Sequence, residues 1–145
     1  YVARLNFDAI ILPGGLPGAY NLRNDVRVIK LIQTQAKRNK LVAAICAVPI
    51  ILEKVVLHKG VKGTSYPSFS DELSFAEYSE DIFVRDDNNY GSGPTTAVYF
   101  ALDIIEYLLG VESATEIKDD ILLNLVEKYL ASVVEKSVVK KFIVY

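Results

Sequence analysis

The only cysteine of the chain, Cys46, stands in the segment LVAAICAVP (41–49), directly after a run of small and apolar residues. A lone cysteine is usually a small buried hydrophobe. A cysteine at the junction of a strand and a helix can instead be a nucleophile, because the free N–H groups at a helix N-terminus stabilise a thiolate. Both interpretations of Cys46 are open on its position alone.

The residues around Cys46 favour a nucleophile elbow, the tight strand-to-helix turn that lifts a side chain clear of a sheet. No glycine or loop separates the expected strand from the expected helix. Ala44 is small, as such a turn requires two residues from the nucleophile, whereas Val48 is not. The backbone amides of Ala47 and Gly15 are candidate donors to an oxyanion, since glycine allows close approach of the backbone to a ligand.

The elements that must position these residues alternate along the chain. Continuous apolar runs predict strands buried on both faces of a parallel sheet over 9–12 and 41–45. Apolar residues at helical spacing predict helices over 26–38, about 47–57, 95–109 and 119–141. The segment LPGAYNLRND (16–25) is expected to be a loop, and 68–94 to be irregular with a hairpin around DDNN.

Such an alternation predicts an α/β fold, in which ligands bind beyond the carboxyl ends of the strands. The segment Pro13-Gly14-Gly15 and Cys46 both stand at such ends. The chain is expected to form a single domain over 1–145, with a C-terminal helix and tail extension over 119–145. The apolar stripe of this extension predicts that 121–145 packs at an interface.

The composition limits the function. The 145 residues are 51% hydrophobic, and 16 basic residues are balanced by 18 acidic ones without a basic stripe. Nucleic acid is therefore not an expected partner. One cysteine excludes an intrachain disulfide and fits a reducing, cytoplasmic location, and no apolar stretch is long enough to span a membrane. The acidic residues between Glu77 and Asp87 fit no calcium loop, so neither a metal nor a cofactor is expected.

Four motifs in order carry a family resemblance: DAIILPGG (8–15), LVAAICAVP (41–49), TSYP (64–67) and GSGPTTAVYFALDIIEYLLG (91–110). Together they resemble the ThiJ/PfpI superfamily and, within it, the DJ-one branch. The resemblance covers about Phe7 to Lys118. It implies a flavodoxin-like three-layer sandwich, a parallel sheet with helices on both faces, shared with class I glutamine amidotransferases.

The resemblance also implies roles for individual residues. Cys46 matches the family's oxidisable, low-pKa nucleophile, and Gly15 and Ala47 match the positions whose amides form its oxyanion site. The neighbouring Gly14 and the loop residues Gly93 and Pro94 match the substrate pocket. Similar proteins are typically homodimers. Their reported activities are cofactor-free conversion of methylglyoxal to lactate, deglycation, and peroxide sensing through a cysteine sulfinate.

Two departures from the family pattern bear on mechanism. The family's supporting carboxylic acid stands on a first strand that would lie before Tyr1, so the chain is expected to lack the first strands of the usual fold. The family's T-H-P segment is Ser65-Tyr66-Pro67 here, so Tyr66 replaces the histidine. His58 falls at the far end of the expected helix, about 16–18 Å from Cys46, which disfavours a Cys-His dyad.

The leading hypothesis is a cofactor-free glyoxalase or deglycase that acts on small α-oxoaldehydes through Cys46. Tyr66 is a candidate hydrogen-bond donor to the reacting oxygens, or simply a half-buried aromatic before a proline. The alternative is a non-catalytic redox-sensing or chaperone-like stress-response homologue, in which peroxide oxidises Cys46 and nothing is turned over.

Overall fold

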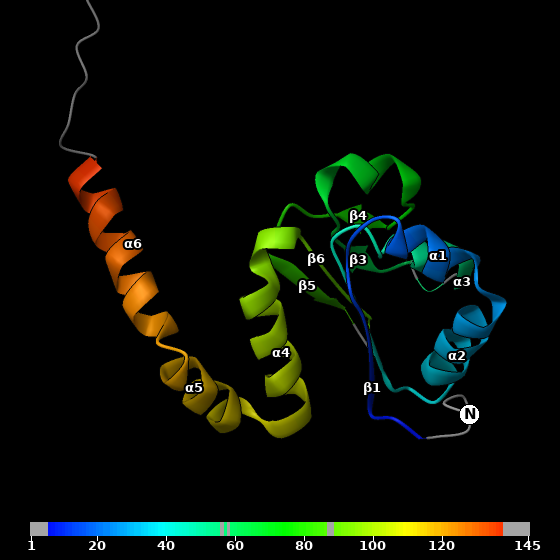
Figure 1. Cartoon of the computed structure of the whole chain (residues 1–145), viewed down its shortest axis with the longest axis horizontal. Coiled ribbons are helices and arrows are strands. Elements are labelled where there is room, and N and C mark those ends of the chain that lie inside the picture. The colour runs from blue at the N-terminus through cyan, green and yellow to red at the C-terminus, as the bar shows by residue number, and fades with distance from the viewer. Residues whose placement is uncertain (1–5, 56, 58, 87–88, 138–145) are drawn as a thin grey trace, which may run out of the picture. The chain divides into compact units, whose positions relative to one another are not determined.

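A computed structural model describes residues 6–55, 57, 59–86 and 89–137 of the chain (Figure 1). The chain divides into two compact units, Tyr1–Ala101 and Leu102–Tyr145. The helices and strands are, in order, β1 (Ala9–Leu12), α1 (Gly18–Asn24), α2 (Val26–Lys37), β2 (Leu41–Ile45), α3 (Ile50–Val55), β3 (Lys62–Gly63), the 3₁₀ helix η2 (Pro67–Glu72), β4 (Glu77–Tyr78), β5 (Phe83–Asp86), β6 (Asn89–Ser92), the 3₁₀ helix η3 (Pro94–Thr96), α4 (Ala97–Leu109), α5 (Val111–Asp120) and α6 (Leu123–Ser137).

The main sheet of the first unit has the strand order β1-β2-β6-β5. Strands β1, β2 and β6 are parallel, and β5 runs antiparallel to β6 with Asp86 opposite Asn89. This pairing confirms the two predicted strands and the predicted hairpin around DDNN. The short strands β3 and β4 form a second, parallel pair.

Strand β2 is buried almost along its whole length. Its residues from Leu41 to Ala44 are completely buried, which agrees with a strand covered on both faces. Val42 and Ala44 pack in one apolar cluster with Ile32 of α2 and Ile51 of α3. The central strand that leads to Cys46 is therefore anchored in the core.

Helix α1 corrects the prediction of a loop over 16–25. The amides of Ala19 and Asn21 donate to the carbonyl oxygens of Gly15 and Pro17, at 2.9 and 3.1 Å, and Ala19 is fully buried. Proline and glycine are tolerated at the start of a helix, where the first N–H groups have no partner inside it. Proline and glycine are also common in turns, and this is why the sequence predicts a loop here.

The second unit also differs from the prediction. In place of one helix over 119–141, the chain forms α5 and α6, separated by a break at which Leu122 has a φ of +59°. The two helices are joined by an ion pair of 2.9 Å between Lys118 and Glu127. Residues 138–145, with the end of the predicted helix, lie outside the described residues. Among those that are described, no helix is long and apolar enough to cross a membrane.

Candidate functional site

The candidate site lies where the three parallel strands end. In the sheet register, the last residue of β1 is opposite Ala44, and the last residue of β6 is opposite Ile45. The chain therefore leaves all three strands at the same end of the sheet, where Cys46 directly follows β2. Gly14 and Gly93 stand in the two flanking segments. The topology thus brings together residues that are far apart in the sequence.

Cys46 itself has a φ of +67°, a left-handed conformation that costs a non-glycine residue about 1–2 kcal/mol. The turn is closed by the amide of Val48, which donates to the carbonyl oxygen of Ile45 at 3.3 Å. The side chain of Val48 is completely buried and belongs to the apolar core cluster. The thiol-bearing residue remains half-buried.

The helix after Cys46 starts later than predicted. Helix α3 begins at Ile50 instead of near Ala47, and has only 6 residues. The intervening residues 46–49 form a tight turn, and the amides of Ile51 and Leu52 in α3 donate to the carbonyl oxygens of Val48 and Pro49, both at 2.9 Å. The short helix makes the helix dipole a weaker source of thiolate stabilisation than the sequence indicates.

Gly14 lies directly against Cys46. A Cβ atom at Gly14 would stand 2.6 Å from the Cβ of Cys46, 3.1 Å from the carbonyl oxygen of Ile45 and 3.4 Å from the Sγ of Cys46. Only glycine allows this approach. Gly15 has a φ of +98°, again a conformation that suits glycine, and its carbonyl accepts from Ala19 at 2.9 Å.

Tyr66 reaches the elbow through its backbone. Its amide donates to the carbonyl oxygen of Cys46 at 2.9 Å, and its side chain is 42% exposed. The preceding Ser65 is buried, and its hydroxyl donates to the carbonyl of Tyr66 at 3.1 Å. The hydroxyl of Tyr78 donates to the carbonyl of Ser65, also at 3.1 Å. Sequence reasoning missed Ser65 and Tyr78.

A cavity of about 370 Å³ adjoins this segment. It is lined by Thr64, Ser65, Pro67, Tyr78, Glu80, Asp81, Ile82, Gly93 and Thr96. Gly93 therefore shares a cavity with Pro67, the residue after Tyr66. Pro94 begins η3, and its side chain lies outside the described part of the chain.

Three carboxylates of this part of the chain, Glu72, Glu77 and Asp81, take part in ion pairs. Glu72 contacts Arg23 at 2.7 Å, and Lys62 contacts Glu77 at 3.1 Å and Asp81 at 3.6 Å. A hydrogen bond from Ser79 and the charge of Lys62 lower the pKa of Asp81 below its usual value. Within the described residues, no group of three or more metal-ligating side chains could hold a metal ion. His58 lies outside the described residues.

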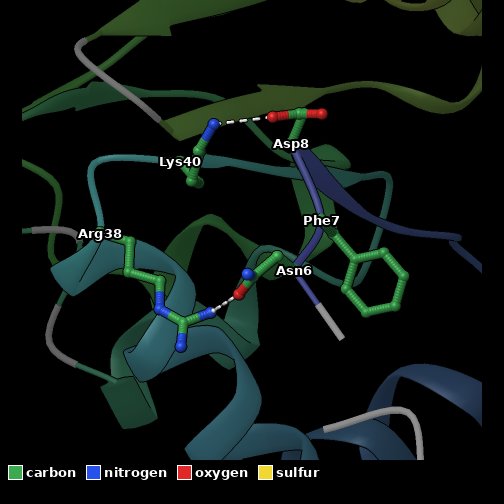
Figure 2. A pocket seen from close by; sticks show the side chains of 5 residues that line it. All are labelled: Asn6, Phe7, Asp8, Arg38 and Lys40. Carbon is green, nitrogen blue, oxygen red and sulfur yellow. Dashed lines mark hydrogen bonds and ion pairs between the residues drawn. The ribbon is translucent and has the colours of Figure 1, made fainter. Parts of the chain in front are cut away.

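A second cavity, of about 450 Å³, lies at the opposite end of the strands (Figure 2). It is lined by Asn6, Phe7, Asp8, Arg38 and Lys40. Phe7 and Asp8 come just before β1, and Arg38 and Lys40 come just before β2. Figure 2 shows Arg38 directed at Asn6 and Lys40 directed at Asp8, both at 2.7 Å. Lys40 and Asp8 form an ion pair, Arg38 donates a hydrogen bond to the uncharged Asn6, and none of these residues belongs to the predicted site.

Comparison with known proteins shows which family the sequence of this chain resembles. The sequence model of the DJ-1/PfpI family matches residues 1–107. The chain is 38% identical over 125 residues to the protein dj-1beta of Drosophila melanogaster, covering 84% of this chain and 67% of the relative. It is 33% identical over 123 residues to a protein of Caenorhabditis elegans named a glutathione-independent glyoxalase, covering 80% of this chain and 63% of the relative.

Solved structures agree with the sequence comparison. The crystal structure of Drosophila melanogaster DJ-1beta matches with a TM-score of 0.80 at 38% identity, covering 83% of this chain and 67% of that one. Toxoplasma gondii DJ-1 in an oxidised form matches with a TM-score of 0.79 at 32% identity, with the same coverage of 83% and 67%. These matches confirm the predicted resemblance and the predicted α/β fold class. The chain spans about two thirds of the fly relative and 30% of the Arabidopsis thaliana protein DJ-1 homolog A.

Proposed function

This chain belongs to the DJ-1/PfpI family, and on that premise we propose that it is a cysteine-dependent, cofactor-free enzyme of glyoxalase or deglycase type. Its substrates are small α-oxoaldehydes, and Cys46 is the nucleophile. The observation that carries the proposal is the strained, half-buried turn of Cys46 at the carboxyl edge of the sheet, with Gly14 against it. The name of the nematode relative, a glutathione-independent glyoxalase, supports the same chemistry.

The proposed reaction starts with attack of the Cys46 thiolate on the aldehyde carbon. A carbon–sulfur bond forms, the π electrons of the carbonyl move to its oxygen, and the amides of Gly15 and Ala47 stabilise the resulting oxyanion. A proton then moves from the former aldehyde carbon to the neighbouring carbonyl carbon, so that the first is oxidised to a thioester and the second reduced to an alcohol. Water cleaves the thioester, and the products are a 2-hydroxy acid and the free thiol.

The other predicted site residues have supporting roles in this reaction. Tyr66, whose backbone contacts Cys46 and whose side chain is 42% exposed, is the proposed hydrogen-bond donor to the substrate oxygens. Gly14, Gly93 and Pro94 are the proposed walls of the substrate pocket, where the absence of side chains at the glycines leaves room beside the thiol. No cofactor takes part in this scheme.

A second candidate function is redox sensing without turnover. The half-buried position of Cys46 leaves it open to small oxidants, and one similar structure, from Toxoplasma gondii, is an oxidised form. In this alternative the thiolate attacks one oxygen of a peroxide, gives a sulfenate and releases water or an alcohol, and a second peroxide molecule oxidises the sulfenate to the sulfinate in the same way. A homodimer in the cytoplasm is part of both proposals.

The test is lactate formation from methylglyoxal without added glutathione, with Cys46→Ala as the control. Turnover that is lost in Cys46→Ala supports the enzyme. Absence of turnover, together with stoichiometric conversion of Cys46 to the sulfinate by peroxide in the intact mass, supports the sensor instead. Turnover that persists in Cys46→Ala overturns both.

A further inference from the structure

We propose that the hydroxyl groups of the buried Ser65 and the half-buried Tyr78 position the oxyanion donor of the site, the backbone amide of Ala47. We call these two residues the hydroxyl clamp. The inference rests on the proposed function, in which that amide stabilises the oxyanion. Neither residue touches the substrate in this scheme, so both are positioning residues.

The first step of the argument is the peptide group that joins Cys46 to Ala47. Its carbonyl oxygen accepts a hydrogen bond from the amide of Tyr66 at 2.9 Å. A trans peptide is planar, and its C=O and N–H groups point in opposite directions. The hydrogen bond from Tyr66 therefore fixes the direction in which the amide of Ala47 points, away from the Tyr66 segment.

The second step concerns what holds Tyr66 in place. The hydroxyl of Ser65 donates to the carbonyl of Tyr66, and the hydroxyl of Tyr78 donates to the carbonyl of Ser65, both at 3.1 Å. The two hydroxyl oxygens are themselves 3.2 Å apart. The clamp thus binds two successive carbonyls of the segment that carries the Tyr66 amide.

The third step is that the clamp has a rigid base. Ser65 is only 3% exposed, and Tyr78 pairs with Gly63 in the parallel ladder of β3 and β4. The amide of Ser79 donates to the carbonyl of Gly63 at 2.8 Å, directly beyond that pair. Because a polar group that is shielded from water is costly to leave without a hydrogen bond, the loss of one of these part-buried hydroxyls loosens the Tyr66 segment.

Loss of the hydroxyl clamp should affect one reaction of Cys46 and not another. Addition of the thiol to an aldehyde creates an oxyanion, and it depends on the direction of the Ala47 amide. Alkylation of the same thiol by iodoacetamide displaces iodide at a saturated carbon and creates no oxyanion. A weakened clamp should therefore impair aldehyde addition and leave alkylation unchanged, which a general structural defect would not do.

The experiment measures how well propanal protects Cys46 from iodoacetamide. Propanal lacks a second carbonyl group, so it adds reversibly to the thiol and cannot proceed to a hydroxy acid. For Tyr78→Phe we expect the apparent dissociation constant of propanal to rise about three- to tenfold, while the alkylation rate without propanal stays within about twofold at every pH. Tyr129→Phe, on an exposed side chain of α6, is the matched control and should change neither quantity.

Ser65→Ala is the second variant, in case Tyr78→Phe does not fold. It should show the same split, and the double variant should be no worse than the single ones, since the two hydroxyls act as one unit. Equal loss of propanal affinity and alkylation rate overturns the proposal, as does no change in either. An unsubstituted protein that propanal does not protect also overturns it. If propanal protection depends on the clamp but methylglyoxal is not turned over, the proposed function fails and the clamp stands.

Discussion

At the scale of single residues, Gly14 determines how closely the segment after β1 can approach the thiol of Cys46. We expect Gly14→Ala to destabilise the protein by about 1–3 kcal/mol, because the added Cβ would stand 2.6 Å from the Cβ of Cys46. Alkylation of Cys46 should change with it, since one of the two segments must shift. Urea unfolding and the iodoacetamide rate measure the two effects. Gly18→Ala, with no atom within 4 Å of its added Cβ, is the control, and equal stability of the two variants would contradict the prediction.

The sequence predicts some residues of the site better than others. The positions of Cys46 and Gly14 follow from the strands that precede them, because a continuous apolar run and its end are visible in the sequence. Ser65 and Tyr78 were not predicted, since their contact depends on the pairing of β3 with β4. Strands of 2 residues leave no period to detect.

At the scale of elements, Asp25 caps α2. Its carboxylate accepts from the amide of Arg27 at 2.8 Å, and hydrogen bonds from the Arg27 side chain are the main cause that lowers the pKa of Asp25 to about 2. A pKa lower in the folded than in the unfolded chain stabilises the fold above the unfolded value near 3.8, and this contribution is lost as the pH falls toward 2.

Asp25→Asn keeps a capping oxygen and removes this titration. We expect the variant to be less stable than the unsubstituted protein near neutral pH, and the difference to shrink between about pH 4 and pH 2. Urea unfolding at a series of pH values measures it. A difference that stays constant with pH would show that the charge of Asp25 does not contribute.

The break between α5 and α6 gives a second prediction at this scale. Leu122 has a φ of +59° and is 59% exposed, so its side chain contributes strain and little packing. We expect Leu122→Gly to raise the melting temperature of the helical signal by a few degrees. The neighbouring Leu123 is buried, and Leu123→Gly should lower it. A destabilised Leu122→Gly would mean that the exposed leucine is packed in solution.

The same elements show what periodicity can predict. Helix α2 was predicted almost to its ends, because its apolar residues repeat regularly over Val26–Lys37. The helix predicted over 119–141 contains α6 but only the last two residues of α5, so most of α5 is missed. An apolar stripe continues across a single residue in the left-handed conformation, so the sequence does not reveal the turn at Leu122.

At the scale of the whole molecule, the prediction concerns association. On α6 the large apolar side chains of Leu125, Val126, Tyr129 and Leu130 are at least half exposed. We expect the chain to form a dimer in which residues 121–145 are packed, as the sequence predicts. Sedimentation velocity of the full chain and of a chain that stops at Asp120 measures this. A dimer that persists with unchanged stability after the truncation would contradict the prediction.

The left-handed backbone of Cys46 has a consequence for the balance between stability and function. Glycine adopts this conformation without strain, so Cys46→Gly should be more stable than Cys46→Ala, by about 1 kcal/mol, although both lack the thiol. A melting comparison of the two variants therefore measures, without any substrate, how much stability this protein gives up to hold a side chain at that turn. If Cys46→Gly proves no more stable, the turn is relaxed and no such trade-off exists.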